Sequence, residues 1–244
     1  KSGGQIYMWA RKTLHYSQMQ TFSLQATWLD GGCLGVPTFF DNYVEGDERL
    51  EKTWRMGQQY ALDGTPLWTN GWCGDPQMLL SYTREVTNIS GDATMYQGYR
   101  FGKYEIKVGA TGTPDNDYVI MRYAEVLMTK AECILRTGGN SQEADLVNEV
   151  RRRNFDTANE LTGAELEATI SCNGVPVKYG RLLQELGVEF ALEGLRRSQL
   201  IRFDDNYTKG TWWEHTPTND TKRNLMLIPF DQLQRNSNLV QNPK

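Results

Sequence analysis

One stretch of this 244-residue chain restricts its fold more than any other: residues 118–139, with the sequence YVIMRYAEVLMTKAECILRTGG. Apolar residues recur through it at helical spacing, and Gly138 and Gly139 follow the last of them, where glycines commonly end helices. Apolar side chains would cover most faces of this helix, whereas a helix at a protein surface carries one apolar stripe. We therefore expect it to pack between neighbours, at least one of which lies outside these 244 residues.

The next stretch, residues 140–155, predicts a second helix. Ser141 is a candidate N-cap, acidic residues follow in the first turns, and the arginines from Arg151 to Arg153 suit the negative end of the helix dipole. The short connection makes the two helices an antiparallel hairpin, similar to one tetratricopeptide unit. No second copy of this hairpin recurs at a fixed period.

Two more helices are predicted after the hairpin. A short one begins after its N-cap Thr162, and the longest runs over residues 179–203, YGRLLQELGVEFALEGLRRSQLIRF. Gly194 lies inside the longest helix, where glycine costs about 1 kcal/mol relative to alanine. We expect Gly194 to admit the close approach of another backbone, and Glu193 to pair with Arg197 four residues later.

Residues 1–116 differ in character from residues 117–244. Glycines, prolines and polar turn residues divide the first part into loops and short extended pieces, one of which covers residues 98–108. The second part holds the predicted helices and closes with an extended run, a proline and a helical turn. We expect a mainly α fold: a scaffold of tetratricopeptide-like helical hairpins with long irregular loops and a few short strands. The two parts would form one integrated domain.

Charge and cysteine content exclude several classes of function. The formal net charge is −4 with acids and bases interspersed, which argues against a nucleic-acid partner. The four cysteines form no C-x-x-C pair and there are only two histidines, so a metal site, a redox motif and a Ser-His-Asp triad are all disfavoured. We expect no metal, no cofactor and no catalytic residues. Cys133 lies within the helical pattern, where a buried free thiol is expected.

Aromatic residues make up 11% of the chain, and many lie in loops rich in glycine, aspartate and asparagine. Flat rings stack on the C–H face of a sugar while polar neighbours bind its hydroxyls, so such loops suit oligosaccharide binding. The alternative is that large loops bury their own rings as small cores. The candidate ligand-binding residues are Trp28, Phe39, Phe40, Asp41, Asn42 and Tyr43 in one loop, and Trp68, Asn70 and Trp72 in another. We interpret Trp212 and Trp213, beyond the longest helix, as packing residues.

Four stretches follow one another along the second part: RYAEVLMTKAECILRTGG, ADLVNEVRRR, EFALEGLRRSQLIRF and LIPFDQLQRNSNLVQNP. In this order and spacing they resemble the C-terminal region of the SusD/RagB family, the surface glycan-binding lipoproteins of Bacteroidetes. The stretch EGDERL, near residue 47, is similar to an Asp-x-Arg signature of the same region. The chain departs from the family's pattern at Glu185-Leu186, where Glu-Arg is usual, and at Gln199-Leu200, where Asp-Leu is typical. Both departures would change ion pairs inside the scaffold.

The resemblance implies a helical scaffold whose loops hold the ligand site. It also implies a cell-surface lipoprotein of the outer membrane whose anchor lies outside this chain. The partners would be an oligosaccharide ligand, a SusC-like TonB-dependent transporter and the N-terminal half of the same protein. The expected function is non-catalytic binding of an oligosaccharide or polysaccharide for delivery to that transporter.

Two other functions stay open from the residues. A glycoside hydrolase would need two carboxylates facing each other in an aromatic cleft. Candidates for that pair are the loop residues Asp30, Asp41, Glu45 and Asp47, or Glu189 with Glu193 on the longest helix. The third function is a helical-repeat adaptor that binds protein and buries its aromatic rings.

Overall fold

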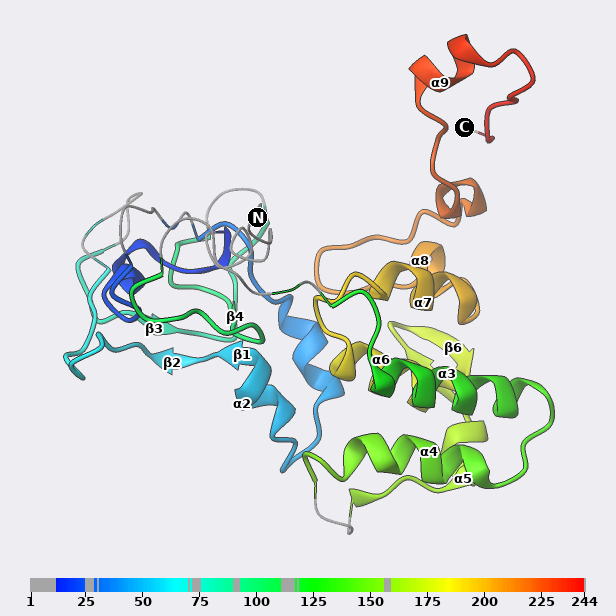
Figure 1. Cartoon of the computed structure of the whole chain (residues 1–244), viewed down its shortest axis with the longest axis horizontal. Coiled ribbons are helices and arrows are strands. Elements are labelled where there is room, and N and C mark those ends of the chain that lie inside the picture. Colours follow the sequence, from blue (N-terminus) through cyan, green and yellow to red (C-terminus); the bar gives the residue numbers. More distant parts are fainter. Residues whose placement is uncertain are drawn as a thin grey trace. The chain divides into compact units, whose positions relative to one another are not determined.

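The computed structural model describes residues 12–24, 29, 31–69, 71, 76–89, 93–110, 117, 119–155 and 159–243. The chain divides into two compact units (Figure 1). The first unit comprises residues 1–125 and 151–159, and the second comprises residues 126–150 and 160–244.

Short elements joined by loops make up the first unit. Two 3-10 helices, η1 (Tyr16–Met19) and η2 (Pro37–Asn42), precede the short α-helix α2 (Arg49–Thr53). Strand β1 (Trp54–Arg55) pairs antiparallel with β4 (Arg100–Phe101), and β2 (Gly57–Gln58) pairs antiparallel with β3 (Ser81–Tyr82). Within the extended segment predicted over residues 98–108, the strand is the two-residue β4, which pairs with the two residues of β1.

Small separate cores hold these loops together. One core consists of Leu14, Phe22, Leu24 and Leu29, and another of Leu67, Leu80 and Tyr82. Each forms where a few apolar side chains from distant loops meet, which is how long loops are stabilised without regular secondary structure.

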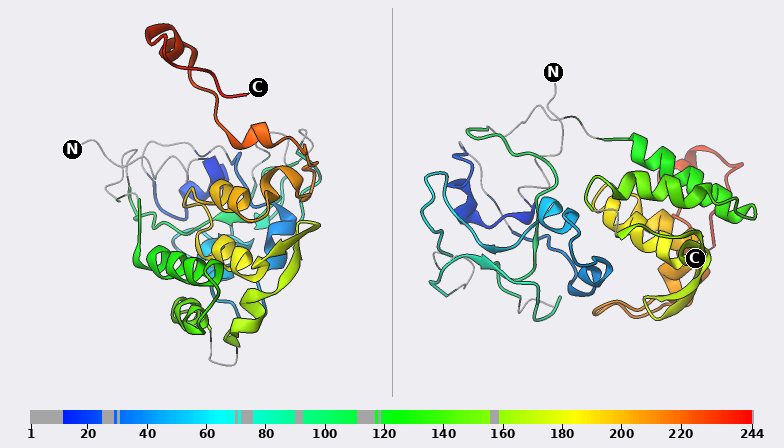
Figure 2. Two further views of the ribbon diagram at one scale, coloured as in Figure 1. Left: turned by 90° about the vertical axis from the view of Figure 1, so that its right-hand side faces the viewer. Right: turned by 90° about the horizontal axis from the view of Figure 1, so that it is seen from below.

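Helices dominate the second unit, to which most of α3 (Tyr123–Arg136) and α4 (Gln142–Arg151) belong. The remaining elements are α5 (Gly163–Glu167), β5 (Thr169–Cys172), β6 (Val175–Lys178), α6 (Gly180–Glu189), α7 (Arg196–Arg202), α8 (Asn206–Lys209), η5 (Thr221–Asn224) and α9 (Phe230–Arg235). Helices α3 and α4 form the predicted hairpin, as Figures 1 and 2 show. The predicted mainly α fold class with a few short strands is confirmed.

Residues 179–203 form two helices, so the prediction of one long helix is wrong. Helix α6 ends at Glu189, Leu192 and Gly194 adopt φ values of 63° and 81°, and α7 begins at Arg196. Gly194 therefore supplies the left-handed backbone of a turn between helices, which costs glycine little. Arg197, the predicted partner of Glu193, donates from Nη2 to the carbonyls of Arg223 and Asn224.

Within α6, Gly187 is approached closely by a side chain. A Cβ atom at Gly187 would lie 2.7 Å from the Arg196 Nη1 atom. That nitrogen donates to the Leu183 carbonyl at 2.8 Å, and burial lowers the pKa of Arg196 to about 10. The missing side chain of Gly187 thus lets the first residue of α7 lie across α6 and fixes how the two helices meet.

Two helix caps and one hairpin test the local predictions. Thr162 caps α5 in a capping box with Glu165, as predicted. Ser141 is not the cap of α4, because its φ is 69° and the Asn140 side chain accepts from the Gln142 N–H instead. The β5–β6 hairpin was not predicted, although its two-residue Asn173-Gly174 turn has the sequence that such turns favour.

The cysteines also correct one expectation. Cys133 is free but exposed, because it lies on the outer face of α3, so the predicted buried thiol is wrong at this position. Cys172 is the buried free thiol instead, and burial raises its pKa. Cys73 lies outside the described residues.

Glu132 connects α3 to α7 within the second unit. Glu132 is 6% exposed. Its carboxylate accepts from Arg202 Nε and Nη2, each at 2.9 Å, and from Arg136 Nε at 3.0 Å. Both guanidinium groups also lie against the Phe203 ring, with centroid distances of 4.8 Å for Arg136 and 5.5 Å for Arg202. One carboxylate therefore binds two cations that both lie against the same aromatic ring.

We expect Glu132→Ala to lower the free energy of unfolding by about 1–3 kcal/mol, the range for lost hydrogen bonds to charged groups. The loss stays moderate because the two arginine side chains are 40% and 39% exposed, so water replaces part of the lost interaction. Urea unfolding followed by circular dichroism measures the effect. Glu149→Ala on the exposed face of α4 is the matched control, with an expected change within about 0.5 kcal/mol. Equal stability of the two variants would contradict the assigned role of Glu132.

Candidate functional site

The first predicted loop forms an aromatic cluster around η2. The Phe40 ring lies 5.0 Å from the Trp54 ring and 4.8 Å from the Tyr99 ring, both edge-on. Phe39 and Tyr43 pack at the margin of the cluster, with their ring centroids 6.0 Å apart. A Cβ atom at Gly35 would lie 2.9 Å from the Trp54 ring, so glycine is needed there for the rings to close.

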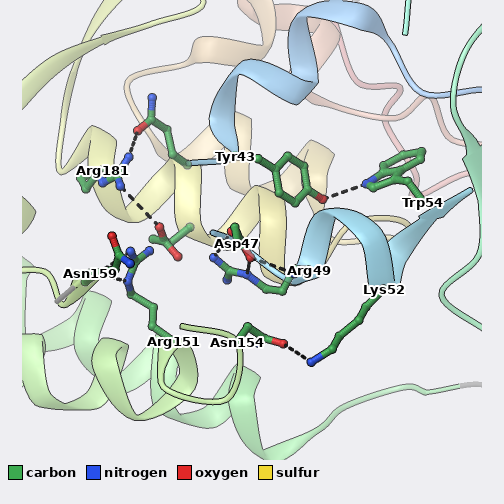
Figure 3. A network of polar contacts seen from close by, with 11 residues as sticks. Tyr43, Asp47, Arg49, Lys52, Trp54, Arg151, Asn154, Asn159 and Arg181 are labelled. Carbon is green, nitrogen blue, oxygen red and sulfur yellow. Dashed lines mark hydrogen bonds and ion pairs between the residues drawn. The ribbon is translucent and has the colours of Figure 1, made fainter. Parts of the chain in front are cut away.

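Polar contacts fix the rim of this cluster. The Trp54 Nε1–H donates to the Tyr43 hydroxyl at 2.8 Å (Figure 3). The Asn42 amide donates to the Phe39 carbonyl at 2.7 Å, and Asp41 forms an ion pair with Arg84. Most of the polar groups between the rings therefore already have protein partners.

The structure separates the first group of candidate residues by exposure. Phe40 is 5% exposed and belongs to the cluster's interior, so its ring has almost no surface left for a ligand. Phe39, Asn42 and Tyr43 are half-buried and Asp41 is exposed, so these four can face solvent. Trp28 lies outside the described residues.

The second predicted loop presents one exposed ring. Trp68 is 48% exposed and forms an antiparallel bridge with Leu79, which is 43% exposed. Hydrogen bonds from Leu80 N to Leu67 O and from Thr69 N to Met78 O hold the two segments together at 2.7 and 2.9 Å. Exposed rings of this kind favour a binding surface. Asn70 and Trp72, the other two candidates of this loop, lie outside the described residues.

An open pocket of ≈ 610 Å³ lies in the first unit. This volume falls within the range that small-molecule sites occupy, about 300–1,000 Å³. The pocket has one wall from η1 and the turn after it, and another from residues 61–63. Its lining residues are Tyr16, Ser17, Met19, Gln20, Ser23, Leu24, Ala61, Leu62 and Asp63.

Hydrogen bonds join the two walls of this pocket. Leu62 N donates to the Gln20 carbonyl at 3.1 Å, and Thr21 Oγ1 donates to the Tyr60 carbonyl at 2.8 Å. Ser17, which lines the pocket, donates its hydroxyl hydrogen bond to the Trp68 carbonyl at 2.5 Å. One lining residue of the pocket is thus hydrogen-bonded to the backbone of Trp68.

A tight turn places Asp63 at the edge of the pocket. The Asp63 Oδ1 atom accepts from Thr65 N at 2.9 Å, and Gly64 supplies the positive φ of 84° that the turn requires. The hydrogen bonds from Thr65 lower the pKa of Asp63, so the carboxylate is ionised at neutral pH.

A buried network of hydrogen bonds joins η1 to Tyr82 and Gln59. The Tyr82 hydroxyl accepts from His15 N at 2.8 Å and donates to Gln18 Oε1, while Gln18 Nε2 donates to Gln59 Oε1 at 2.9 Å. Burial raises the pKa of Tyr82 to about 12, which keeps its hydroxyl neutral and able to donate. Buried hydrogen bonds of this kind rigidify the segments that they join.

Sequence reasoning missed the pocket residues Tyr16 and Asp63. The Asp63-Gly64 pair is a recognisable turn signal, and a hairpin at that point was within reach of the sequence. The meeting of this turn with η1 was not, because it depends on hydrogen bonds between segments about forty residues apart in the chain, such as Thr21 with Tyr60.

The two side chains of the Asp-x-Arg signature, Asp47 and Arg49, are buried and paired with each other. Arg49 donates from Nε to Asp47 Oδ1 at 2.9 Å and from Nη2 to Asp47 Oδ2 at 2.8 Å, and the two side chains are 6% and 1% exposed (Figure 3). Beside this pair, Lys52 Nζ lies 3.5 Å from Asn154 Oδ1 within the same unit. In the second unit, the Arg181 Nη2 atom lies 3.9 Å from Glu185 Oε1 on α6.

The remaining candidates have packing contacts or are buried. Trp212 stacks on His215 at a centroid distance of 3.8 Å, in agreement with a packing role. Glu189 and Glu193 are 4% and 8% exposed. Across the described part of the chain, no group of three or more histidine, cysteine, aspartate or glutamate residues is arranged to hold a metal ion.

Comparison with known proteins identifies the family. A sequence model described as the SusD family matches residues 36–244. The starch-binding protein SusD of Bacteroides thetaiotaomicron is 35% identical over 135 residues, which are 53% of this chain and 22% of that protein. The solved surface glycan-binding protein A from Bacteroides thetaiotaomicron matches with a TM-score of 0.59 at 19% identity, over 99% of this chain and 47% of that chain. A SusD-like protein from Bacteroides fragilis gives a TM-score of 0.59 at 16% identity, over 99% of this chain and 52% of that chain.

The two solved structures have the same fold as this chain. The family assignment rests on the match to the sequence model. The chain spans 22% of the curated relative and about half of the two solved relatives. The family match covers both units of the structure, including the buried Asp-x-Arg pair and the helical hairpin. This chain belongs to the SusD family.

Proposed function

We propose that this chain binds an oligosaccharide or polysaccharide without cleaving it. The observation that carries the proposal is the match to the SusD family over residues 36–244. Two of the relatives that it resembles are named for starch binding and for surface glycan binding. The exposed Trp68 ring, and an open pocket elsewhere in the first unit, add the kinds of surface that sugar binding needs.

We further propose that the two parts of the chain have different roles. Loop-rich residues 1–116 would carry the ligand contacts, and residues 117–244 would supply the helical scaffold. The proposed contacts in the described loops are Trp68 together with the solvent-facing Phe39, Asp41, Asn42 and Tyr43. Trp28, Asn70 and Trp72 remain predicted contacts from the same loops.

Two of the loop carboxylates that could serve a hydrolase already have cationic partners. A glycosidase needs one carboxyl group as a proton donor and a second as a nucleophile or base. Asp47 is held by Arg49 in a buried pair, and Asp41 is paired with Arg84. Neither is an unpaired acid, which disfavours Asp41 and Asp47 as the two carboxylates of a hydrolase. Of the other two candidates, Glu45 is exposed and Asp30 lies outside the described residues.

We also propose that the protein acts at the outer-membrane surface and passes its ligand to a SusC-like TonB-dependent transporter. Family membership supports this role. The described residues contain no helix that is both long and apolar enough to span a bilayer. The N-terminal half of the same protein would complete the fold, as the partial coverage of the relatives suggests.

Incubation of the full-length protein with a panel of plant, host and microbial oligosaccharides tests the function. Tryptophan fluorescence reports binding, and chromatography of the same samples reports cleavage. We expect quenching by one class of glycan and full recovery of every sugar. Shortened products would overturn the non-catalytic assignment, and a panel without any binding would overturn the function itself.

We expect Trp68→Ala to weaken binding of the glycan found in that panel about threefold to tenfold, the effect of losing one aromatic stacking partner. Isothermal titration calorimetry of wild type and variant measures it. Leu79→Ala is the matched control, because Leu79 lies opposite Trp68 with similar exposure but has no ring. A loss of affinity in Leu79→Ala equal to that in Trp68→Ala would point to damage of the hairpin rather than to a lost stacking contact.

A further inference from the structure

The pocket between η1 and residues 61–63 has the build of a preformed ligand site. Its two walls are tied by hydrogen bonds between backbone and side-chain groups of residues 20–21 and 60–62. Its floor reaches a core, since the lining residue Leu24 belongs to the cluster of Leu14, Phe22 and Leu29, and Met19 packs against it. A site that is rigid before the ligand arrives loses less conformational entropy on binding.

Apolar and aromatic groups give this pocket surface on which a sugar ring can lie. Tyr16 is 40% exposed and Leu62 is 58% exposed, although both are large enough to be buried in a core. Such exposed side chains around a concavity mark binding surfaces more often than isolated ones do. The Tyr16 ring is the natural stacking partner for the C–H face of a pyranose.

Polar groups with unused hydrogen-bonding capacity line the same pocket. The side chains of Gln20 and Ser23 make no hydrogen bond to the part of the chain that the structure describes. The Asp63 carboxylate accepts from Thr65 N and has further acceptor sites, since an ionised carboxylate has about four. The Gln20 amide, the Ser23 hydroxyl and the Asp63 carboxylate are therefore available to form hydrogen bonds with the hydroxyl groups of a sugar.

The charge on the lining is of one sign only. Among the described lining residues, Asp63 alone is ionised at neutral pH, and no lysine, arginine or histidine is present to neutralise a bound acid. A ligand carboxylate or sulfate entering the pocket would meet this negative charge without a compensating cation. Neutral hydroxyl groups would instead donate to it.

We infer that this pocket is a subsite for uncharged sugar residues, in which Tyr16 stacks on the ring, Asp63 accepts from its hydroxyls and acidic sugars are rejected. The inference rests on the proposed glycan binding and adds to it a location and a class of ligand. It predicts a preference for neutral glycans over uronic-acid-containing or sulfated ones.

The test compares one oligosaccharide in two charge states. Maltohexaose, cellohexaose and mannohexaose are titrated into the full-length protein, and the hexasaccharide that binds best is then oxidised at its primary alcohols to carboxylates. At about 10 mM salt, where exposed charges act over roughly 30 Å, we expect the oxidised form to bind wild type about threefold to tenfold more weakly than its parent. Asp63→Asn should remove most of that difference, because asparagine retains the turn and the acceptor but loses the charge.

Tyr16→Ala tests the stacking contact in the same assay. We expect it to weaken the neutral hexasaccharide about threefold to tenfold. Tyr60→Ala is the control, because Tyr60 is 50% exposed in the adjoining segment but does not line the pocket. Thermal melting of each variant checks that its fold is intact.

Three results would overturn the inference while leaving glycan binding in place. They are wild-type affinity in Tyr16→Ala, equal affinity of wild type for the neutral and oxidised forms, and an unchanged preference in Asp63→Asn. If wild type bound none of the three hexasaccharides and no other glycan of the wider panel, both the proposed function and this subsite would be overturned.

Discussion

Asp47→Ala should lower the free energy of unfolding by about 3–5 kcal/mol, the cost of removing one partner of a buried ion pair. Three contacts disappear together, because the Asp47 carboxylate accepts from the Arg49 backbone N–H at 3.0 Å as well as from Nε and Nη2. The Arg49 guanidinium stays buried against the Phe155 ring, 5.3 Å from its centroid, where water cannot readily replace a carboxylate. Guanidinium chloride unfolding followed by circular dichroism measures the change.

The neighbouring ion pair, between the N-cap residue Glu48 and Lys52 of α2, provides a control. Glu48 and Lys52 are paired at 2.6 Å, but their side chains are 60% and 59% exposed. Glu48→Ala should therefore change stability by no more than about 1 kcal/mol, as exposed pairs do. If Asp47→Ala cost no more than Glu48→Ala, the Asp-x-Arg pair would not be a structural element of the fold, and a functional role for Asp47 would have to be reconsidered.

Local signals in the sequence were sufficient for much of the helical scaffold. The hairpin of α3 and α4, the cap at Thr162 and the turn of helix after Pro229 all follow from periodicity and capping chemistry, which involve residues within a few positions of one another. The family resemblance rested on these same segments. Local agreement of this kind is what a foldable sequence is expected to show.

Contacts between distant segments explain where the sequence was misleading. The pattern over residues 179–203 is apolar at helical spacing on both sides of the turn, so periodicity could not show that the chain reverses at Leu192 and Gly194. The break depends on Arg196, whose guanidinium packs on Gly187 of the preceding helix. Side-chain packing between two helices overrides local propensity here, as tertiary contacts generally do.

The candidate site shows the same limit. Composition pointed to the aromatic loops, but it could not separate rings that face solvent from rings that fill a loop core. Trp68 is of the first kind and Phe40 of the second. The pocket of Tyr16 and Asp63 had no aromatic run to mark it, because its walls come from two segments that meet only in the folded chain.

Phe40→Ala distinguishes a core ring from a ligand ring at the centre of the first candidate loop. We expect the substitution to lower the free energy of unfolding by about 3–5 kcal/mol, the usual cost of truncating a buried phenylalanine. The reason is that the ring is 5% exposed and contacts Trp54 and Tyr99, so its removal leaves a cavity between them. Chemical unfolding measures the stability, and titration with the glycan of the panel measures the affinity under conditions where the variant is folded.

Phe39→Ala is the matched variant, since Phe39 lies in the same 3-10 helix but is only half-buried. It should cost less stability than Phe40→Ala, and it should weaken glycan binding if the solvent-facing side of this cluster contacts the ligand. The opposite pattern, with Phe40→Ala losing affinity at near-normal stability, would mean that the Phe40 ring becomes accessible to the ligand. In that case the cluster around η2 would be a binding surface that opens on contact with a sugar, and its close packing in the free protein would be the state that the ligand displaces.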